Sequence, residues 1–336
     1  MDSITKYIKR TTKAKPEKAS QIMEEAYFFG EHNCSKPTCS NKAYFKSQNS
    51  SVLLCGVHSK SIPRTKLPKN PNAKQIQIQK QAQHQKEVQQ AQKLNQSSSK
   101  PGQVVCTPLR MMKLPEDIKG FQKVFPNFRH GNRTDGLGLP SLSPMKLGPV
   151  VHNQKDLPLC KTLENFHQFN KVYPQELNDE GKIGDVFWKK LKSGYESDQG
   201  QRHKYGRQDK PKFSVHKVGD EVRRYTYIQS RWFYCHHYEK LTEGNGDLEM
   251  LRKLKREGTN LQLVGYDGYP IEKDLYDVYC DPRRPFGHES VLYVLLTVDS
   301  PEEYPWNLYF LNHRELYELK KKDDSDENMS VGDHSQ

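Results

Sequence analysis

The alternation of apolar and polar residues is most regular in the last third of the chain, where it predicts a series of short elements. The run that begins at Val222 alternates as a strand does. A helix capped by Ser230 is expected to follow as far as Leu241. A second helix is predicted over residues 247–257, because its leucines fall on one side and Gly258 supplies a stop.

Further apolar runs continue this order towards the C-terminus. Residues 260–268 are typical of a strand that ends in a glycine-flanked turn, and residues 274–281 of a helix. We expect an apolar helix through residues 291–295, and a last strand and helix within 308–319. Strands that alternate with helices indicate an α/β or α+β domain, which we place at residues 151–320.

The regular pattern is lost in the two stretches before this domain. From residue 66 to 102 glutamine and lysine dominate without a steady helical period, which favours a disordered linker over a marginal, solvated helix. Residues 103–150 carry repeated proline and glycine, which favours extended chain draped over another surface. We therefore predict a small N-terminal module over 1–62, a linker over 63–150 and an acidic, disordered tail over 321–336.

Composition indicates a chain that is only partly packed. Of its 336 residues 34% are hydrophobic and the mean hydropathy is −0.95, both low for a chain with a core throughout. Seven scattered cysteines fit a reducing compartment better than a disulfide framework. No apolar run is long enough to span a bilayer, and the N-terminus is charged where a signal peptide is apolar. We expect a soluble, intracellular protein that does not enter a membrane.

The positive charge of the chain lies in one interval. Residues 1–58 hold nine basic and five acidic residues, residues 59–130 hold fourteen and three, and residues 131–336 hold thirty and thirty-three. The formal charge of +12 therefore comes from the first 130 residues. Any phosphate-binding surface is expected there and not in the larger C-terminal part.

Three cysteines and a histidine near the N-terminus have the spacing of a metal site. Cys34 and Cys39 form one pair, fifteen residues follow, and Cys55 and His58 form a second pair. Thiolates and a neutral imidazole bind zinc, and four protein ligands close its tetrahedral shell without room for an activated water. We predict a structural Zn²⁺ site, with His32 as a substitute ligand. The alternative is three unrelated cysteines beside a surface histidine.

Basic residues follow the cysteine cluster closely. They are Lys60, Arg64, Lys66, Lys69 and Lys74. A positive face formed from them would bind phosphates in a salt-sensitive and largely sequence-independent way. The alternative is a solvated, lysine-rich linker. Few aromatic residues lie among the lysines, which argues against stacking on single-stranded bases.

The turn from Gly265 to Gly268 is a candidate ligand site in the C-terminal domain. Open α/β sheets bind ligands where strands end, and glycine there allows close approach to the backbone. Asp267 is suited to accept ribose hydroxyls, Arg283 to bind phosphate and His288 to transfer a proton. The glycine spacing of dinucleotide sites and P-loops is missing. The alternative is a tight turn with arginines at the surface.

Six short phrases of the chain carry a resemblance: CGVHSK, LPKNPN, RWFYCHHYEKL, GYDGYP, RPFGHESVLYVLL and EYPWNLY. Together they resemble a group of uncharacterised proteins of large eukaryotic DNA viruses, of the iridovirus type. The resemblance spans the cysteine cluster and most of the C-terminal domain. It implies a host-cell or virion setting and no particular reaction.

Three functions compete on these observations. The first is a non-catalytic, zinc-stabilised binding protein that attaches to nucleic acid or to a protein partner through residues 1–130. The second is an enzyme or sensor for a nucleotide-like small molecule in the C-terminal domain. The third is a virion or assembly component. No Ser/His/Asp order, His-Glu-x-x-His or paired-carboxylate motif selects a reaction.

Overall fold

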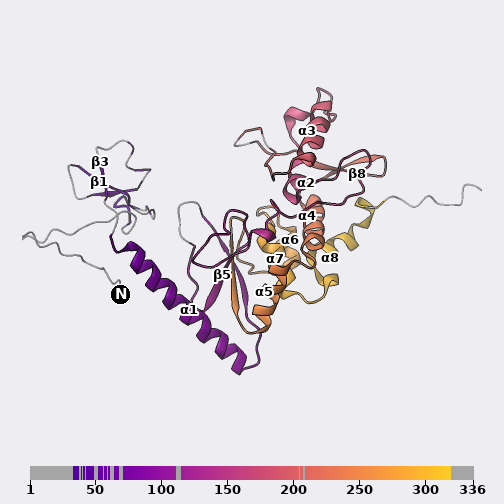
Figure 1. Ribbon diagram of the computed structural model, residues 1–336. Coiled ribbons are helices and arrows are strands. Elements are labelled where there is room, and N and C mark those ends of the chain that lie inside the picture. The colour runs from indigo at the N-terminus through magenta and orange to yellow at the C-terminus, as the bar shows by residue number, and fades with distance from the viewer. Residues whose placement is uncertain are drawn as a thin grey trace, which may run out of the picture. The chain divides into compact units, whose positions relative to one another are not determined.

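The protein forms two compact units, Met1–Ala82 and Gln83–Gln336, in the computed structural model (Figure 1). The boundary between them falls inside helix α1 (Ala73–Ser97). The structure describes residues 33–37, 39, 41, 43–48, 52–55, 57–58, 60, 64–67, 71–110, 115–203, 205–206 and 209–318. The predicted acidic tail over 321–336 therefore lies outside the described residues, as does His32.

The N-terminal unit is built on three short antiparallel strands. They are β1 (Phe45–Ser47), β2 (Leu53–Leu54) and β3 (Arg64–Lys66), in the order β2-β1-β3. Phe45 lies opposite Leu54 on one side and Lys66 on the other. Among the residues of this unit that the structure describes, the buried hydrophobic cluster consists of Ala43, Leu53 and Leu67. So small a core stabilises a fold weakly, which is the situation in which small domains depend on a metal or disulfide.

Helix α1 shows that part of the predicted disordered linker is wrong. Residues 73–97 form one helix, although the helix has no apolar stripe. Such a helix is marginal in isolation. Its carboxyl half belongs to the C-terminal unit, where Val88 is buried and Asn95 Nδ2 donates to the carbonyl of Gly258 at 2.8 Å. These tertiary contacts stabilise a helix that its own residues would form only marginally.

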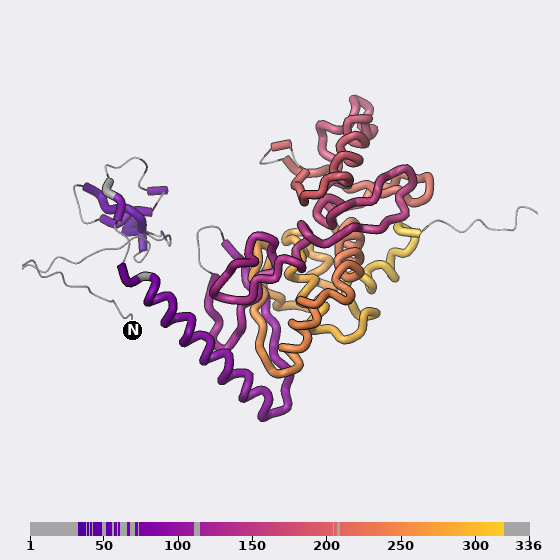
Figure 2. The backbone as a smooth tube through the Cα atoms, viewed as in Figure 1, coloured from indigo at the N-terminus to yellow at the C-terminus, as the bar shows by residue number. Residues whose placement is uncertain are grey.

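A four-stranded parallel sheet forms the first layer of the C-terminal unit. Its strands, in spatial order, are β4 (Val104–Pro108), β10 (Asn260–Gly265), β5 (Phe121–Phe125) and β6 (Leu137–Gly138). Figure 2 shows β10 between two strands that come from much earlier in the chain. The predicted extended linker over 103–150 is therefore wrong, because this segment supplies three of the four strands.

A second, antiparallel sheet and the helices complete this unit. The sheet consists of β7 (Lys171–Val172), β8 (Phe213–Val218) and β9 (Glu221–Tyr225). The helices are α2 (Leu163–Phe169), α3 (Asp185–Glu196), α4 (Tyr227–Thr242), α5 (Gly246–Arg256), α6 (Leu275–Cys280), α7 (His288–Thr297) and α8 (Pro305–Asn312), with 3-10 turns at Pro140–Leu142, Pro174–Glu176, Pro301–Glu303 and Arg314–Leu316. Helix α7 lies on β4 and β10, while α4 contacts α7, α8, α2 and the second sheet.

Two local predictions are corrected by this arrangement. Helix α4 begins after Thr226 and not after Ser230, because the Thr226 hydroxyl accepts from the N–H of Gln229 and the Gln229 side chain accepts from the N–H of Thr226. Within residues 308–319 the described part is helical, so the strand predicted there is wrong. The predicted strand at the start of 260–268 is confirmed as β10.

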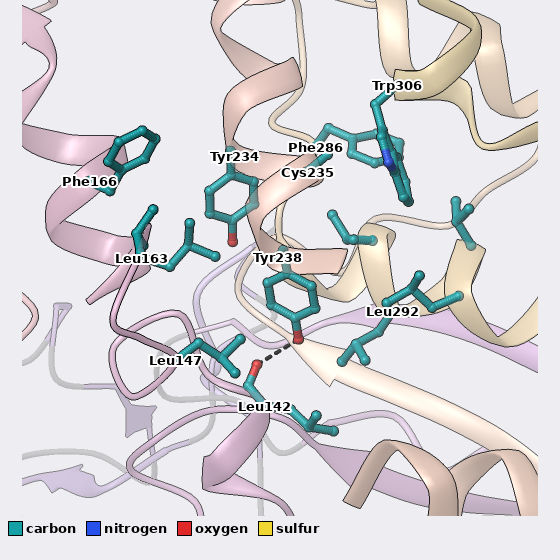
Figure 3. Close-up of a cluster of buried hydrophobic side chains, with 14 of the residues drawn as sticks. Leu142, Leu147, Leu163, Phe166, Tyr234, Cys235, Tyr238, Phe286, Leu292 and Trp306 are labelled. Atoms are coloured by element: carbon teal, nitrogen blue, oxygen red, sulfur yellow. Dashed lines mark hydrogen bonds between the residues drawn. The ribbon is translucent and has the colours of Figure 1, made fainter. Parts of the chain in front are cut away.

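Helix α4 is buried on most of its circumference, and Figure 3 shows why. Tyr234 faces Leu163 and Phe166 of α2, whereas Trp306 lies beyond the opposite side of the helix. The Tyr238 hydroxyl donates to the carbonyl of Leu142 at 2.6 Å. A helix that is apolar on several sides belongs in a core, and α4 accordingly contacts the second sheet and α7, the helix that lies on the parallel sheet.

Candidate functional site

The four predicted metal ligands of the N-terminal unit lie together. One donor atom from each of Cys34, Cys39, Cys55 and His58 lies within 4.8 Å of the others. Local hydrogen bonds hold the two ligand pairs in place: the N–H of Ser35 donates to the carbonyl of a β2 residue at 2.8 Å, and its hydroxyl accepts from the same residue at 3.0 Å. The prediction that these four side chains form one cluster is confirmed.

The separations within this cluster suit a tetrahedral ion. Cys39 Sγ and Cys55 Sγ are 3.9 Å apart, and His58 Nδ1 lies 3.4 Å from Cys34 Sγ and 3.5 Å from Cys55 Sγ. Zinc bonds of about 2.3 Å to sulfur and 2.0–2.1 Å to nitrogen give edges of roughly 3.8 and 3.6 Å in a tetrahedron. Although burial raises the pKa of Cys55, backbone N–H groups of Val57 and His58 lower it to about 6, which favours the thiolate that a metal requires.

The predicted basic face is only partly within the described residues. Lys60, Lys66 and Lys74 are exposed. Arg64 lies on β3, but its side chain and the whole of Lys69 lie outside the described residues.

A second group of residues gathers at the carboxyl ends of the parallel strands. β10 ends at Gly265, and the next residues form the predicted turn. Helix α7 begins above this edge, with Gly287 as its N-cap. A Cβ placed on Gly287 would lie 3.2 Å from Asp267 Oδ2 and 3.1 Å from Glu289 Oε2, so both carboxyl groups approach the same point. Ligands of parallel sheets commonly bind at this edge.

The start of α7 is held in place by a buried arginine. The guanidinium of Arg231 on α4 donates to the main-chain carbonyls of Tyr279, Asp281 and Arg284. Tyr279 lies near the end of α6, and Asp281 and Arg284 lie in the loop that leads from it into α7. The arginine therefore holds the loop from which α7 begins.

Three of the four predicted ligand-binding residues meet here and the fourth does not. Gly265, Asp267 and His288 each lie beside Glu289. The Arg283 side chain is instead 75% exposed and binds Asp281, with Nη2 and Oδ2 2.7 Å apart. The position of Arg283 does not support its predicted role at this site.

Glu289 is the central residue of the group. Its side chain is fully buried, and a Cβ on Gly265 would lie 1.5 Å from its Oε1, so the carboxyl group occupies space that only glycine leaves open. His288 Nδ1 is 3.4 Å from Glu289 Oε2. Among the described residues neither carboxyl oxygen has a hydrogen bond of normal geometry, and His288 Nε2 has none either. Buried polar atoms rarely remain unpaired in folded proteins.

Burial sets the charge state of these residues. It raises the pKa of Glu289 to about 7, although the N–H groups of Glu289 and Asp267 act in the opposite direction. It lowers the pKa of His288 to about 4, against the effect of Asp267. Burial and the neighbouring Glu289 both raise the pKa of Asp267. Near neutral pH the histidine is therefore neutral, and a proton is available on a carboxyl group.

Two cations from a distant part of the chain act electrostatically on carboxyl groups at and near this edge. Lys171 on β7 and the exposed Arg202 both act electrostatically on Asp267 and on the buried Glu164. Neither cation makes an ion pair within 4.0 Å with any carboxylate that the structure describes. Burial lowers the pKa of Lys171 to about 8, while Glu164 raises it.

Sequence patterns identified one part of this site and missed the rest. Glu289 follows His288 at the start of an apolar helix, and its position at a helix N-terminus was the available signal. Lys171 and Arg202 carry no local signal, because they lie on β7 and in the segment before β8, far along the chain from the Asp267 on which they act.

Over the part of the chain that the structure describes, no helix combines the length and apolarity needed to cross a membrane. Comparison with protein-family models, with curated proteins and with solved structures finds no match for this chain.

Proposed function

We propose that the C-terminal unit binds a nucleotide-like small molecule at the carboxyl edge of its parallel sheet. We call this the carboxyl-edge site and define it by Gly265, Asp267, His288 and Glu289 with the cations Lys171 and Arg202. The observation that carries the proposal is the fully buried Glu289, whose two oxygens lack hydrogen bonds of normal geometry. A ligand that supplies those bonds would remove the penalty of leaving them unpaired.

The charges of the site favour a ligand with two unlike ends. Carboxyl groups lie at the strand ends, and two cations that influence them make no contact with them. A ligand between the two sets would present hydroxyl or N–H donors to Asp267 and an anionic group to Lys171 and Arg202. A nucleotide has this distribution, with a phosphate at one end and donors on its sugar and base.

Binding of nucleoside monophosphates to the full chain tests this proposal. Titration calorimetry with AMP, GMP, CMP and UMP should detect binding by at least one of them. Arg202→Ala should weaken it about tenfold, the lower end of what one charge-assisted hydrogen bond contributes. Arg283→Ala is the matched control, because that arginine is exposed and bound to Asp281. Unchanged affinity in R202A, or a loss confined to R283A, would contradict the placement of the phosphate.

The N-terminal unit supports a second function, attachment to nucleic acid or to a protein partner. We propose that Cys34, Cys39, Cys55 and His58 hold a structural Zn²⁺, and that the metal stabilises a unit whose own core is small. The observation that favours attachment is the set of exposed lysines near this cluster. A host-cell or virion setting remains part of this proposal and rests on the viral resemblance alone.

Salt-dependent binding of labelled DNA and RNA tests the attachment function. A triple alanine variant of the N-terminal lysines should bind more weakly at low salt and show a shallower dependence on salt, by about one unit of slope per lost phosphate contact. The residues are Lys60, Lys66 and Lys74. A control variant replaces three exposed lysines of the C-terminal unit, Lys189, Lys192 and Lys212. Equal loss in both variants would indicate a nonspecific effect of charge.

A further inference from the structure

Within the described part of the chain, several titratable groups act on or adjoin Glu289, and no lysine or arginine does. Asp267 approaches from the turn after β10, and His288 precedes Glu289 on α7. Cys106 on β4 and Tyr238 on α4 also feel its charge, as does Tyr234 on the same helix. Lys171 and Arg202 act on Asp267 but not on Glu289. An ionised carboxylate in this position would be buried without a counter-charge.

The N–H groups of Glu289 and Asp267 lower the pKa of this carboxyl group without offsetting its burial, and the side-chain donors nearby do not bond to it. The Tyr238 hydroxyl is committed to the carbonyl of Leu142 at 2.6 Å. The Cys106 thiol donates to the main-chain carbonyl of Glu289 at 3.7 Å and not to its side chain. His288 Nδ1 is 3.4 Å away without the alignment of a hydrogen bond. Burying an unpaired charge is far less favourable than burying a neutral acid.

We propose that Glu289 is the proton donor of the carboxyl-edge site: it is protonated in the free protein, and its O–H donates to an acceptor atom of the ligand. The inference rests on the site of the proposed function. Asp267, which is less buried and lies within the influence of Lys171 and Arg202, is the ionised partner. The pair thus presents one donor and one acceptor side by side.

This arrangement narrows the class of ligand. A group with an acceptor atom beside an N–H, as on the edge of a purine or pyrimidine, matches a carboxylic acid beside a carboxylate. If the proton is transferred, the O–H bond of Glu289 breaks and its electron pair stays on the oxygen. A new bond from hydrogen to nitrogen or oxygen forms on the ligand. The positive charge gained by the ligand is then balanced by Asp267.

Infrared spectroscopy of the full chain without ligand tests the protonation of Glu289. A carboxylic-acid C=O band should be present at pH 6, decline with a midpoint near pH 7 and be missing from the Glu289→Gln variant. Glu164→Gln is the matched control, since burial also raises the pKa of that carboxyl group. A band that persists in E289Q and disappears in E164Q would overturn the inference, as would no band at all.

A second measurement avoids dependence on the folding of E289Q. Carbon-13 NMR of wild-type protein labelled at glutamate carboxyl carbons should show one resonance that titrates near pH 7, and its absence would overturn the inference. Both measurements are made without ligand. Failure of every nucleotide to bind would therefore remove the proposed ligand, whereas an ionised Glu289 at pH 6 would remove the proton donor.

Discussion

Glu289→Gln should change how the stability of the C-terminal unit depends on pH. Burial raises the pKa of the Glu289 carboxyl group from its ordinary 4.5 to about 7. At low pH the group is protonated in both the folded and the unfolded chain. As pH rises from about 4.5 to 7, the unfolded chain loses this proton while the folded chain retains it, so the free energy of unfolding falls. Above about pH 7 this fall in the free energy of unfolding is complete.

The size of this effect follows from the shift in pKa. Raising the pKa from 4.5 to about 7 corresponds to about 3 kcal/mol, most of which falls between pH 5 and pH 8 because the unfolded chain is already partly ionised at pH 5. Glutamine does not titrate, so E289Q should lack this part of the pH dependence. The penalty for burying the glutamine amide lowers the free energy of unfolding equally at every pH, so it does not change the pH dependence.

Urea unfolding followed by tryptophan fluorescence provides the assay. All three tryptophans, Trp188, Trp232 and Trp306, lie in the C-terminal unit, so the signal reports that unit. Between pH 5 and pH 8 the wild type should lose about 2–3 kcal/mol more stability than E289Q. The exposed Glu272→Gln serves as the control and should behave as the wild type. Equal losses in the wild type and E289Q would show that the folded protein holds the carboxyl group ionised, and would refute the reasoning.

Three further outcomes are expected. Cys55→Ser should reduce bound zinc well below one ion per chain, as measured by mass spectrometry of the metal, whereas Cys280→Ser, outside the cluster, should leave it unchanged. Gly265→Ala should lower the free energy of urea unfolding by about 1–3 kcal/mol, since its Cβ would overlap Glu289 Oε1. Gly246→Ala, which meets nothing within 4 Å at the start of a helix, should be neutral or stabilising by up to about 1 kcal/mol. Tyr238→Phe should lower that free energy by about 1–3 kcal/mol through loss of a buried 2.6 Å hydrogen bond, and no loss would show that water replaces the hydroxyl.

The parts of the molecule that were predictable depend on short-range order. The metal cluster is such a case, because each ligand pair spans only a few residues and Cys55 directly follows a strand. Strand β10 and the turn after it are a second case, since a short apolar run that ends in glycines can form few structures other than a strand and a turn. The candidate ligand-binding residues Gly265, Asp267 and His288 were chosen from local patterns of the same kind. Arg283 was chosen for its nearness in sequence, and the structure places it at the surface.

The parts that were missed depend on partners far along the chain. Strands β4 and β5 were taken for linker because their partner, β10, follows more than 130 residues later. Parallel pairing leaves no turn between partners, so neither strand shows a hairpin signal. Helix α1 was missed for a similar reason: its hydrogen bonds go to the turn before β10, and its own apolar residues form no stripe.

By itself, the sequence determined the cysteine–histidine cluster, the strand and turn at Gly265 and an apolar helix through residues 291–295, which the structure begins at His288. These features are local, and chain geometry over a few residues is sufficient to specify them. Only the tertiary structure decided that Glu289 is buried, without a counter-charge among the described residues, and that Lys171 and Arg202 act electrostatically on the neighbouring Asp267. Burial and electrostatic influence depend on every element that packs around a residue, and here those elements come from four separate stretches of the chain.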